Sequence, residues 1–300
     1  MKIIIFDGYV NGCVIQNLIA RQTKIGLIVI LVYAVSACSL KTIYNRLYYL
    51  IPSYVEGMVT LDDVLEEKVK QHSLVLINWH RNTQLIQYAD WLRALQHDLG
   101  PELSEERLLQ HFEIMATFWH SLSMQINEEM VALLPFLNAE QREELFESIA
   151  EKNDDFRDEF VDLDEDERIA SYTEFMLENY ENWLGNLTDR QKREIEKASG
   201  ELRSSAGLRL EQRLKWQRSI QAILDSSNPA AQKSEGLRTF FAGFDMNDHA
   251  DMKAINLANK QILAQLTMQI AHGLTAEQKQ YFISKTNDYI QIFTELANNR

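Results

Sequence analysis

Cysteine and proline are scarce in this chain of 300 residues, and their scarcity limits the fold. Only four prolines interrupt the chain, and few stretches combine β-branched residues with strict alternation, so little of the sequence favours strands. The two cysteines are Cys13 and Cys38. We therefore predict an all-α fold whose stability comes from packing rather than from disulfides.

Motifs of the common catalytic classes are also missing. There is no Gly-x-Ser-x-Gly elbow, no Ser-x-x-Lys and no glycine-rich phosphate loop, and no two histidines lie three or four residues apart as in a helical zinc pair. Asp162, Asp164 and Asp166 match the start of an EF-hand-like loop, but Glu167 and Thr173 break the pattern. We expect no catalytic residues, no metal and no cofactor.

The amino-terminal segment has the layout of a secretory signal. Residues 25–37 carry no charge and follow Arg21 and Lys24, and this run is shorter than the ~20 apolar residues of a transmembrane helix. It ends in four residues with the pattern of a lipobox: Val35, Ser36, Ala37 and Cys38. We therefore predict a signal peptide over residues 1–37, cleavage before Cys38, and acylation of that cysteine by fatty acids such as palmitate.

Cleavage before Cys38 changes both the thiols and the charge of the chain. It removes Cys13, so the body keeps no second thiol and forms no internal disulfide. It also removes three basic residues against one acidic residue, which takes the formal charge from −14 to −16. Such a body is repelled by nucleic acid and by anionic lipid head groups. We therefore expect membrane attachment through the amino-terminal lipid and no nucleic-acid partner.

Two further features concern the start of the chain and its destination. Residues 1–23 are long for a leader and contain Asp7, so one interpretation places the true start of translation nearer Arg21. Ser39, rather than aspartate, follows the cysteine. By resemblance to sorted lipoproteins of Gram-negative bacteria, this implies a lipid anchor in the outer membrane of the cell envelope, with the body on the periplasmic face.

Downstream of Cys38, apolar residues recur at the three-four spacing of one helical face. Examples are Leu85, Tyr88, Leu92 and Leu95, and near the end Phe282, Tyr289, Phe293 and Leu296. Glycine, proline and asparagine mark breaks between such runs. We predict an elongated multi-helix bundle after the cleaved lipoprotein signal peptide, with a helical body over 38–225, a candidate linker at 226–247 and a C-terminal helical hairpin over 248–300. Five aromatic residues are expected in its core: Trp91, Phe112, Trp119, Phe136 and Trp216.

A short motif recurs at four predicted helix starts. A leucine precedes a Ser, Thr or Asn whose side-chain oxygen can accept a free amide of the new helix, and Glu or Gln follows two to three residues later. The four cap residues are Ser104, Asn138, Thr188 and Thr275. The pattern predicts capping boxes. The same letters resemble the LTxxQ signature of small periplasmic stress chaperones, which keeps a chaperone-like holdase open as an alternative.

Several blocks follow one another in a characteristic order. They are Tyr44-Asn45, residues 48–54, the block from Trp79 through His80, Arg81 and Thr83 to Leu85, the acidic segment 153–157, and the block from Trp183 through Gly185 to Thr188. Together with the lipobox they resemble an uncharacterised lipoprotein family of Gram-negative bacteria, a helical domain of unknown function. The resemblance runs from Cys38 to about Leu224. It implies a helical envelope lipoprotein, and it supplies no catalytic residues.

The block Trp79-His80-Arg81 holds the one histidine that resembles a candidate general base. A catalytic base needs partners that the sequence does not show. We therefore expect Trp79 to pack inward, and His80 and Arg81 to form hydrogen bonds with neighbouring carboxylates.

Three functional classes follow from these observations. The first is a lipid-anchored periplasmic binding or scaffold protein of the outer membrane that holds an envelope protein partner. The second is the chaperone-like holdase. The third is a peptidoglycan-active enzyme, for which the sequence offers only Glu147-Ser148 without companion substrate-binding motifs. We favour the first class.

Overall fold

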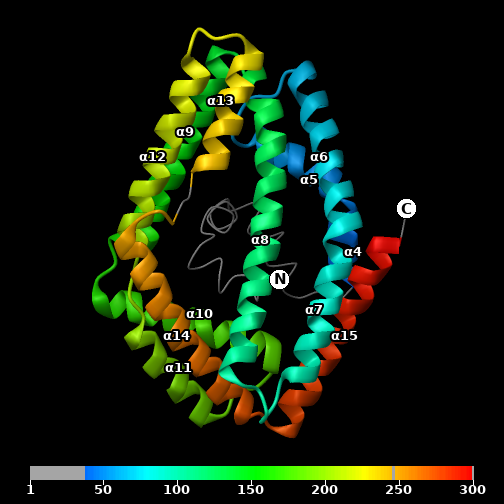
Figure 1. Ribbon diagram of the computed structural model, residues 1–300, viewed down its shortest axis with the longest axis vertical. Helices are drawn as coiled ribbons and strands as arrows, with labels where there is room; N and C mark the ends of the chain where they lie inside the picture. The colour runs from blue at the N-terminus through cyan, green and yellow to red at the C-terminus, as the bar shows by residue number, and fades with distance from the viewer. Residues whose placement is uncertain (1–37, 245–246, 299–300) are drawn as a thin grey trace.

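A computed structural model describes residues 38–244 and 247–298, and every regular element within them is a helix (Figure 1). The predicted all-α class is confirmed, and the helices form an elongated bundle. The predicted signal peptide, with Val35, Ser36 and Ala37, lies outside the described residues. In the part of the chain that is described, no helix combines the length and apolar character that crossing a membrane requires.

The first helices build the flank on the right of Figure 1 and the central strut. Two short helices, α4 (Cys38–Asn45) and α5 (Leu47–Glu56), precede the longer α6 (Asp63–Thr83) and α7 (Leu85–Asp98). Helix α8 (Glu105–Leu133) then runs along the long axis through the middle of the molecule (Figure 1).

The remaining helices form the two ends and the left flank of the bundle, except that α15 (Ala276–Asn298) rises along the right flank beside α7 (Figure 1). The upper part holds the 3₁₀ turn η1 (Leu134–Phe136), α9 (Ala139–Phe156), α12 (Ala206–Asp225) and α13 (Ala230–Gly243). A π-helical turn, η2 (Arg157–Val161), follows α9. The lower part holds α10 (Glu165–Leu184), α11 (Asp189–Glu201), α14 (Ala250–His272) and α15 (Ala276–Asn298).

Helix boundaries fall where glycine, proline and capping residues predict them. Helix α10 ends directly before Gly185, α13 begins directly after Pro229, and α14 ends directly before Gly273. The sequence does not predict the boundary at Gln84, which separates α6 from α7 without a proline or a glycine. Local chemistry therefore accounts for most of the boundaries, whereas the interruption at Gln84 has no side-chain cap.

The last helix completes the core of the first ones. Ile292, Phe293 and Leu296 of α15 are buried in one apolar cluster with Tyr44 of α4 and Leu85 of α7. The same helix contributes Phe282 to the cluster that α10, α11 and α14 build at the lower end. Helix α15 therefore joins two cores, and the C-terminal segment is an integral part of the bundle.

The two C-terminal helices do not lie along each other as the predicted hairpin implies. Helix α14 packs against α8 and α11, whereas α15 packs against α7 and α10, so the two diverge from the turn at Gly273 (Figure 1). Near this turn both helices still contribute to the lower apolar cluster, α14 through Leu266 and Ile270 and α15 through Phe282. The last two helices are therefore joined at a turn, but they pack along different helices of the bundle.

Helix α13 occupies most of the segment 226–247, for which we expected a linker. Leu237 is fully buried and Phe241 is 8% exposed, in a cluster with Val131 of α8 and Ile220 of α12. Apolar residues at helical spacing between the two glycines of this segment supply the buried face. Pro229 marks the start of a packed helix here, not of an unstructured connection.

Of the five aromatic residues expected in the core, Trp91 is buried, and Phe112, Trp119 and Trp216 are half-buried. The expectation is wrong for Phe136, whose side chain is 54% exposed. Phe136 lies in the single 3₁₀ turn η1, which does not follow the period of the preceding helix. Its ring is covered instead by Lys68, whose Nζ lies 3.9 Å from the ring centroid.

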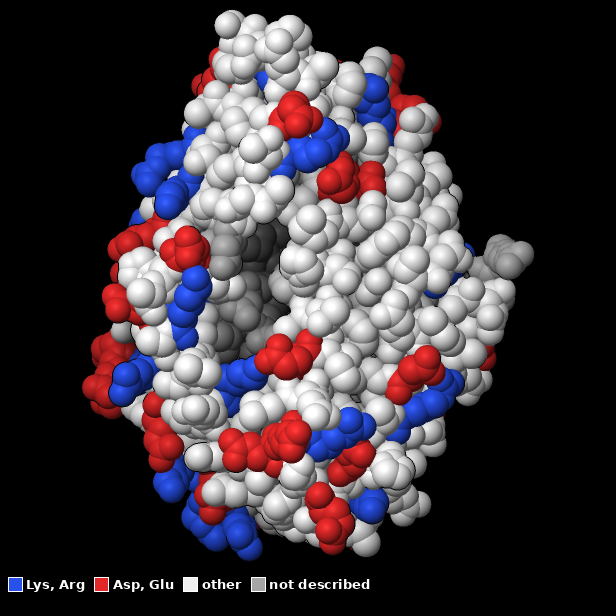
Figure 2. Space-filling model, in the orientation of Figure 1, with Lys and Arg blue, Asp and Glu red and all other residues white. Residues whose placement is uncertain are grey.

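One face of the molecule is hollowed. Figure 2 shows a deep hollow beside the central helix α8, on its left in the orientation of Figure 1. Among the ion pairs of α8, Glu113 pairs with Lys260 of α14, and Glu128 lies 3.9 Å from Arg238 of α13. Acidic and basic side chains are mixed over this face, so the net negative charge is not concentrated in a single patch there (Figure 2).

Candidate functional site

Motif residues from α4, α6 and α7 meet at one junction. The hydroxyl of Tyr44 lies 3.0 Å from Nδ1 of His80, and the ring of Tyr88 packs edge-on against His80 with centroids 5.5 Å apart. Arg81 donates from Nη2 to Oδ1 of Asn45 at 3.4 Å, and its guanidinium lies 5.6 Å from the ring centroid of Tyr44. This α4–α6 junction therefore fastens the first helix of the body to the bundle.

The carboxylate expected beside His80 is replaced by the phenol of Tyr44, so that prediction is wrong. The partner lies 36 positions upstream, on a helix whose packing the sequence does not reveal. Burial lowers the pKa of His80 to about 4, so the ring is neutral near neutral pH. Burial also raises the pKa of Tyr44, although Arg81 opposes it. A neutral imidazole beside a neutral phenol forms a structural contact, and no activated nucleophile adjoins it.

The two other motif residues of this block support the helix itself. Thr83 donates its hydroxyl to the carbonyl of Trp79 at 2.7 Å, one turn earlier in α6. Trp79 is half-buried, with its ring centroid 6.3 Å from that of His80. These contacts position the end of α6 before the bend at Gln84.

The second motif block lies at the other end of the bundle. Trp183 is 7% exposed, and its ring lies against Tyr289 and Phe282 of α15, with centroids 5.4 and 6.4 Å away. Gly185 ends α10 with a φ of +73°, and a Cβ added there would lie 3.5 Å from the ring of Tyr281. Both the left-handed backbone and the close aromatic ring favour glycine at this position. The contacts of this block therefore hold α15 against α10.

The structure does not bring the two motif blocks together. The Trp79–Thr83 block contacts Tyr44 of α4 and Tyr88 of α7 through His80, whereas Trp183 belongs to the apolar cluster of α10, α11 and α14. The acidic segment 153–157 forms a third junction, where the buried Asn153 accepts from Nε of Arg213 in α12 at 3.1 Å. Family-motif residues are thus distributed over separate helix junctions.

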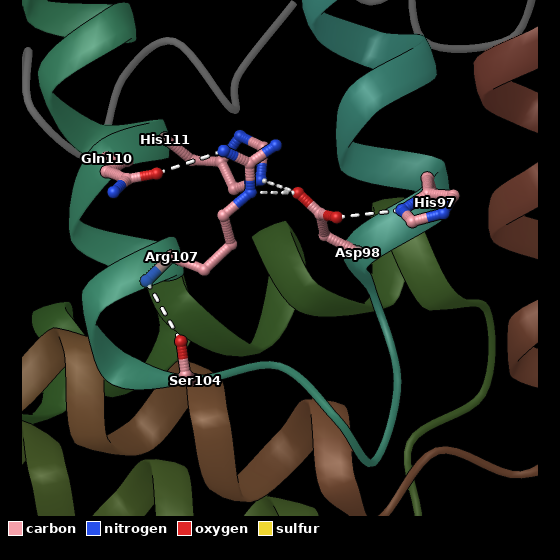
Figure 3. Close-up of polar contacts among 6 residues, drawn as sticks. All are labelled: His97, Asp98, Ser104, Arg107, Gln110 and His111. Carbon is pink, nitrogen blue, oxygen red and sulfur yellow. Dashed lines mark hydrogen bonds and ion pairs between the residues drawn. The ribbon is translucent and has the colours of Figure 1, made fainter.

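A polar cluster that the sequence analysis missed surrounds Asp98, the last residue of α7 (Figure 3). His111 of α8 places Nε2 3.0 Å from one carboxylate oxygen, and Arg107 of α8 reaches the same oxygen through Nε. His97 places Nδ1 2.9 Å from the other oxygen. Burial raises the pKa of Asp98, but the three hydrogen bonds and the Arg107 charge outweigh it and lower the pKa to about 2.

The Asp98 cluster fixes one histidine in a defined state. His111 is 2% exposed, and burial lowers its pKa although Asp98 opposes this effect. A neutral His111 beside an ionised carboxylate carries its proton on Nε2, which donates to Asp98. Its Nδ1 is then an acceptor, buried and without a hydrogen-bond partner. A sequence signal existed, because Arg107 occupies the third helical position, where the other copies of the capping motif have glutamine.

The predicted capping boxes are confirmed at the starts of α9, α11 and α15. Asn138, Thr188 and Thr275 each accept the amide three residues later, and the glutamine there returns its oxygen to the cap amide. At α8, Ser104 accepts the amide of Arg107 at 3.2 Å (Figure 3). The motif therefore acts locally as a set of helix starts.

The glutamines of these boxes also connect helix starts with one another. Nε2 of Gln191 donates to Oε1 of Gln278 at 3.1 Å, and Nε2 of Gln278 donates back to Oε1 of Gln191 at 2.8 Å. Both side chains are at most 4% exposed. Gln141 likewise donates to the carbonyl of Thr60, just before α6, at 3.0 Å. The glutamine of the capping motif thus forms hydrogen bonds between parts of the chain that are distant in sequence.

In the described ranges, 38–244 and 247–298, no group of three His, Cys, Asp or Glu side chains is arranged so that it could hold a metal ion. In the EF-hand-like segment, Asp164 instead caps α10 by accepting the amide of Glu167 at 2.9 Å. The acidic segment is used for helix capping.

The fold and these junctions define an all-α protein in which motif residues hold helices together. A family model matches residues 54–241, more than half of the chain. The chain belongs to that family, DUF6279, described as a family of unknown function. Comparisons with curated proteins and with solved structures found no match. The matched range includes most of α13, which agrees with the packing of that helix into the body.

Proposed function

We propose that this protein is a lipid-anchored lipoprotein of the outer membrane, on its periplasmic face, that works as a non-catalytic binding or scaffold protein. One observation carries the proposal: helix α4 (Cys38–Asn45), which contains the last residue of the lipobox pattern, is packed into the bundle through Lys41 and Tyr44. The lipid would therefore attach to the bundle without a spacer. A tethered scaffold benefits from this arrangement, because the anchor then sets the position of the whole body.

The contacts of α4 support a rigid attachment. The helix spans eight residues, and within it Lys41 pairs with Glu295 of α15 at 2.7 Å and Tyr44 meets His80 of α6. Eight helical residues extend only about 12 Å. The proposed acylated residue thus lies within two turns of contacts to both the last helix and α6. Each buried CH₂ of an acyl chain contributes about 0.8 kcal/mol to membrane binding, so several chains hold such a body firmly.

The use of the motif side chains supports a non-catalytic role. His80, the candidate base, is held neutral against a phenol, and the buried glutamines of the capping motif bond to each other. The face shown in Figure 2 mixes acidic and basic side chains, which suits the polar rim of an interface with a partner.

Lipidation is tested by substituting the two cysteines separately. Cells are given a radiolabelled fatty acid, and the protein is followed by its label and its mass. Cys38→Ala is expected to lose all label and to keep residues 1–37, whereas the matched control Cys13→Ala is labelled and cleaved like the parent. Equal labelling of Cys38→Ala and the parent would refute the anchor.

The scaffold role is tested by cross-linking in living cells. A photoreactive residue is placed at Leu257 of α14, whose side chain is 60% exposed, and as a control at the exposed Asp251 on the same helix. One partner at near-equal stoichiometry, captured from Leu257 and not from Asp251, supports a scaffold. A broad set of unfolded envelope proteins would support the holdase instead, and release of muropeptides by the purified protein would support the peptidoglycan enzyme.

A further inference from the structure

A cavity of about 140 Å³ lies where α7, α8, α10, α14 and α15 converge. Its surface is almost entirely apolar, and no Asp, Glu, Lys or Arg of the described residues lines it. Water is held in a cavity by roughly two to four polar partners, which this surface does not supply. An engineered apolar cavity of roughly 150 Å³ stays dry and binds benzene. This space therefore has the volume and the surface of a site for one small apolar molecule.

Polar residues border the cavity, but little of their polar surface reaches it. The hydroxyls of Tyr180 and Thr267 lie 2.8 Å apart and bond to each other. His111 directs Nε2 to the carboxylate of Asp98, which does not line the cavity. A charged or hydroxylated ligand would lose hydrogen bonds to water on entering and would find little polar surface in return. The wall therefore selects against polar ligands.

Aromatic side chains form much of the wall. They come from four helices and are Trp91, Phe112, Tyr180, Trp183 and Phe282. Aromatic rings attract one another in offset or edge-to-face arrangements, beyond the effect of the area that they bury. Met115 of α8 adds a polarisable thioether, which also packs favourably against aromatic rings. These side chains favour an aromatic ring over an aliphatic chain as the occupant.

We infer that this cavity binds one small, neutral and apolar aromatic molecule of about the size of benzene. The volume limits the ligand to a single ring, and the apolar surface disfavours charged groups and hydroxyl groups. The site is separate from the proposed anchor at Cys38 and does not depend on it.

The inference is tested by titrating the full chain with benzene and with phenol while NMR follows the methyl groups of its methionines. The signal of Met115 is expected to move, since this residue lines the cavity. The signal of Met130, which packs against the cluster of α12 and α13, should not move. Benzene is expected to bind at least tenfold more tightly than phenol, because the cavity offers little to replace the water bonded to the hydroxyl.

Two pairs of variants locate the site. Ala271→Leu fills the cavity and should abolish benzene binding. Ala264→Leu changes another buried alanine of α14, which is not part of the wall, and it should leave the affinity unchanged. Leu184→Ala enlarges the cavity, so naphthalene should bind this variant at least tenfold more tightly than it binds the parent. Leu187→Ala, in the same apolar cluster but outside the wall, should give no such gain.

Three results would overturn the inference. They are an unmoved Met115 signal, an affinity for phenol that equals or exceeds that for benzene, and equal effects of Ala271→Leu and Ala264→Leu. Circular dichroism confirms that each variant is folded. If either leucine variant fails to fold, Leu184→Ala and Leu187→Ala decide the question, and equal affinities of these two variants for naphthalene would overturn the inference.

Discussion

Acidification is expected to destabilise the α4–α6 junction through His80. Burial lowers the pKa of this imidazole from 6.5 to about 4 in the folded protein. Between these two values the unfolded chain binds more protons, so the contribution of His80 to stability is complete above pH 6.5 and is lost as the pH falls toward 4. From about pH 7.5 to about pH 5, the free energy of unfolding falls by about 2 kcal/mol through this residue alone.

Urea unfolding of the parent and of His80→Asn at both pH values measures this loss. Asparagine keeps a polar atom near Tyr44 but takes up no proton. Other groups, including His111, titrate in both proteins, so the difference between the two pH dependences isolates His80. The parent should lose about 2 kcal/mol more than the variant.

The same reasoning is refuted by either of two results. One is an NMR titration in which the His80 ring proton reports a pKa near the ordinary value of 6.5. The other is an identical pH dependence of stability in the parent and in His80→Asn. Either result would mean that the imidazole is solvated and that the Tyr44 contact does not bury it.

Three further sets of substitutions probe the helix junctions. Gly185→Ala should lower the free energy of unfolding by about 1–3 kcal/mol, because the backbone there has a φ of +73°. Gly200→Ala in α11 is the control: an added Cβ meets open space there, so this substitution should be neutral or stabilising. Thermal unfolding compares the two variants. Gln191→Leu and Gln278→Leu should each lower the free energy of unfolding by about 2 kcal/mol. A double-mutant cycle should give a coupling of about 1 kcal/mol between the two glutamines, and the absence of this coupling would contradict their pairing. Asp98→Asn should cost about 2 kcal/mol at neutral pH in urea unfolding, and this cost should fade from about pH 5 toward pH 1, since the pKa of Asp98 is lowered to about 2.

The sequence predicts the features that depend on near neighbours along the chain. Thr188 and Thr275 cap their helices as expected, because a capping box needs only residues within one turn. Gly185 likewise ends α10 through its own backbone conformation. Such features depend on a few consecutive residues, so the sequence predicts both where they occur and which hydrogen bonds they form.

The partners of those same residues could not be predicted. Tyr44 meets His80 across 36 positions, and Gln191 meets Gln278 across 87. The period of an apolar face shows that a helix is buried, but it does not show against which helix. For the same reason the sequence does not reveal the cavity around Trp183, whose wall draws on five separate helices.

The position of α15 has a consequence for how the chain acquires its structure. Lys41 and Glu295, 254 positions apart, pair at the seam between the first and last described helices. The core of α4 and α7 therefore stays open until the final segment arrives, and closing so long a loop is slow. A chain synthesised from its amino terminus cannot bury this core early, and a truncation that removes α15 leaves its apolar surface uncovered. We therefore expect a body that lacks α15 to be more prone to aggregation and proteolysis than the full chain.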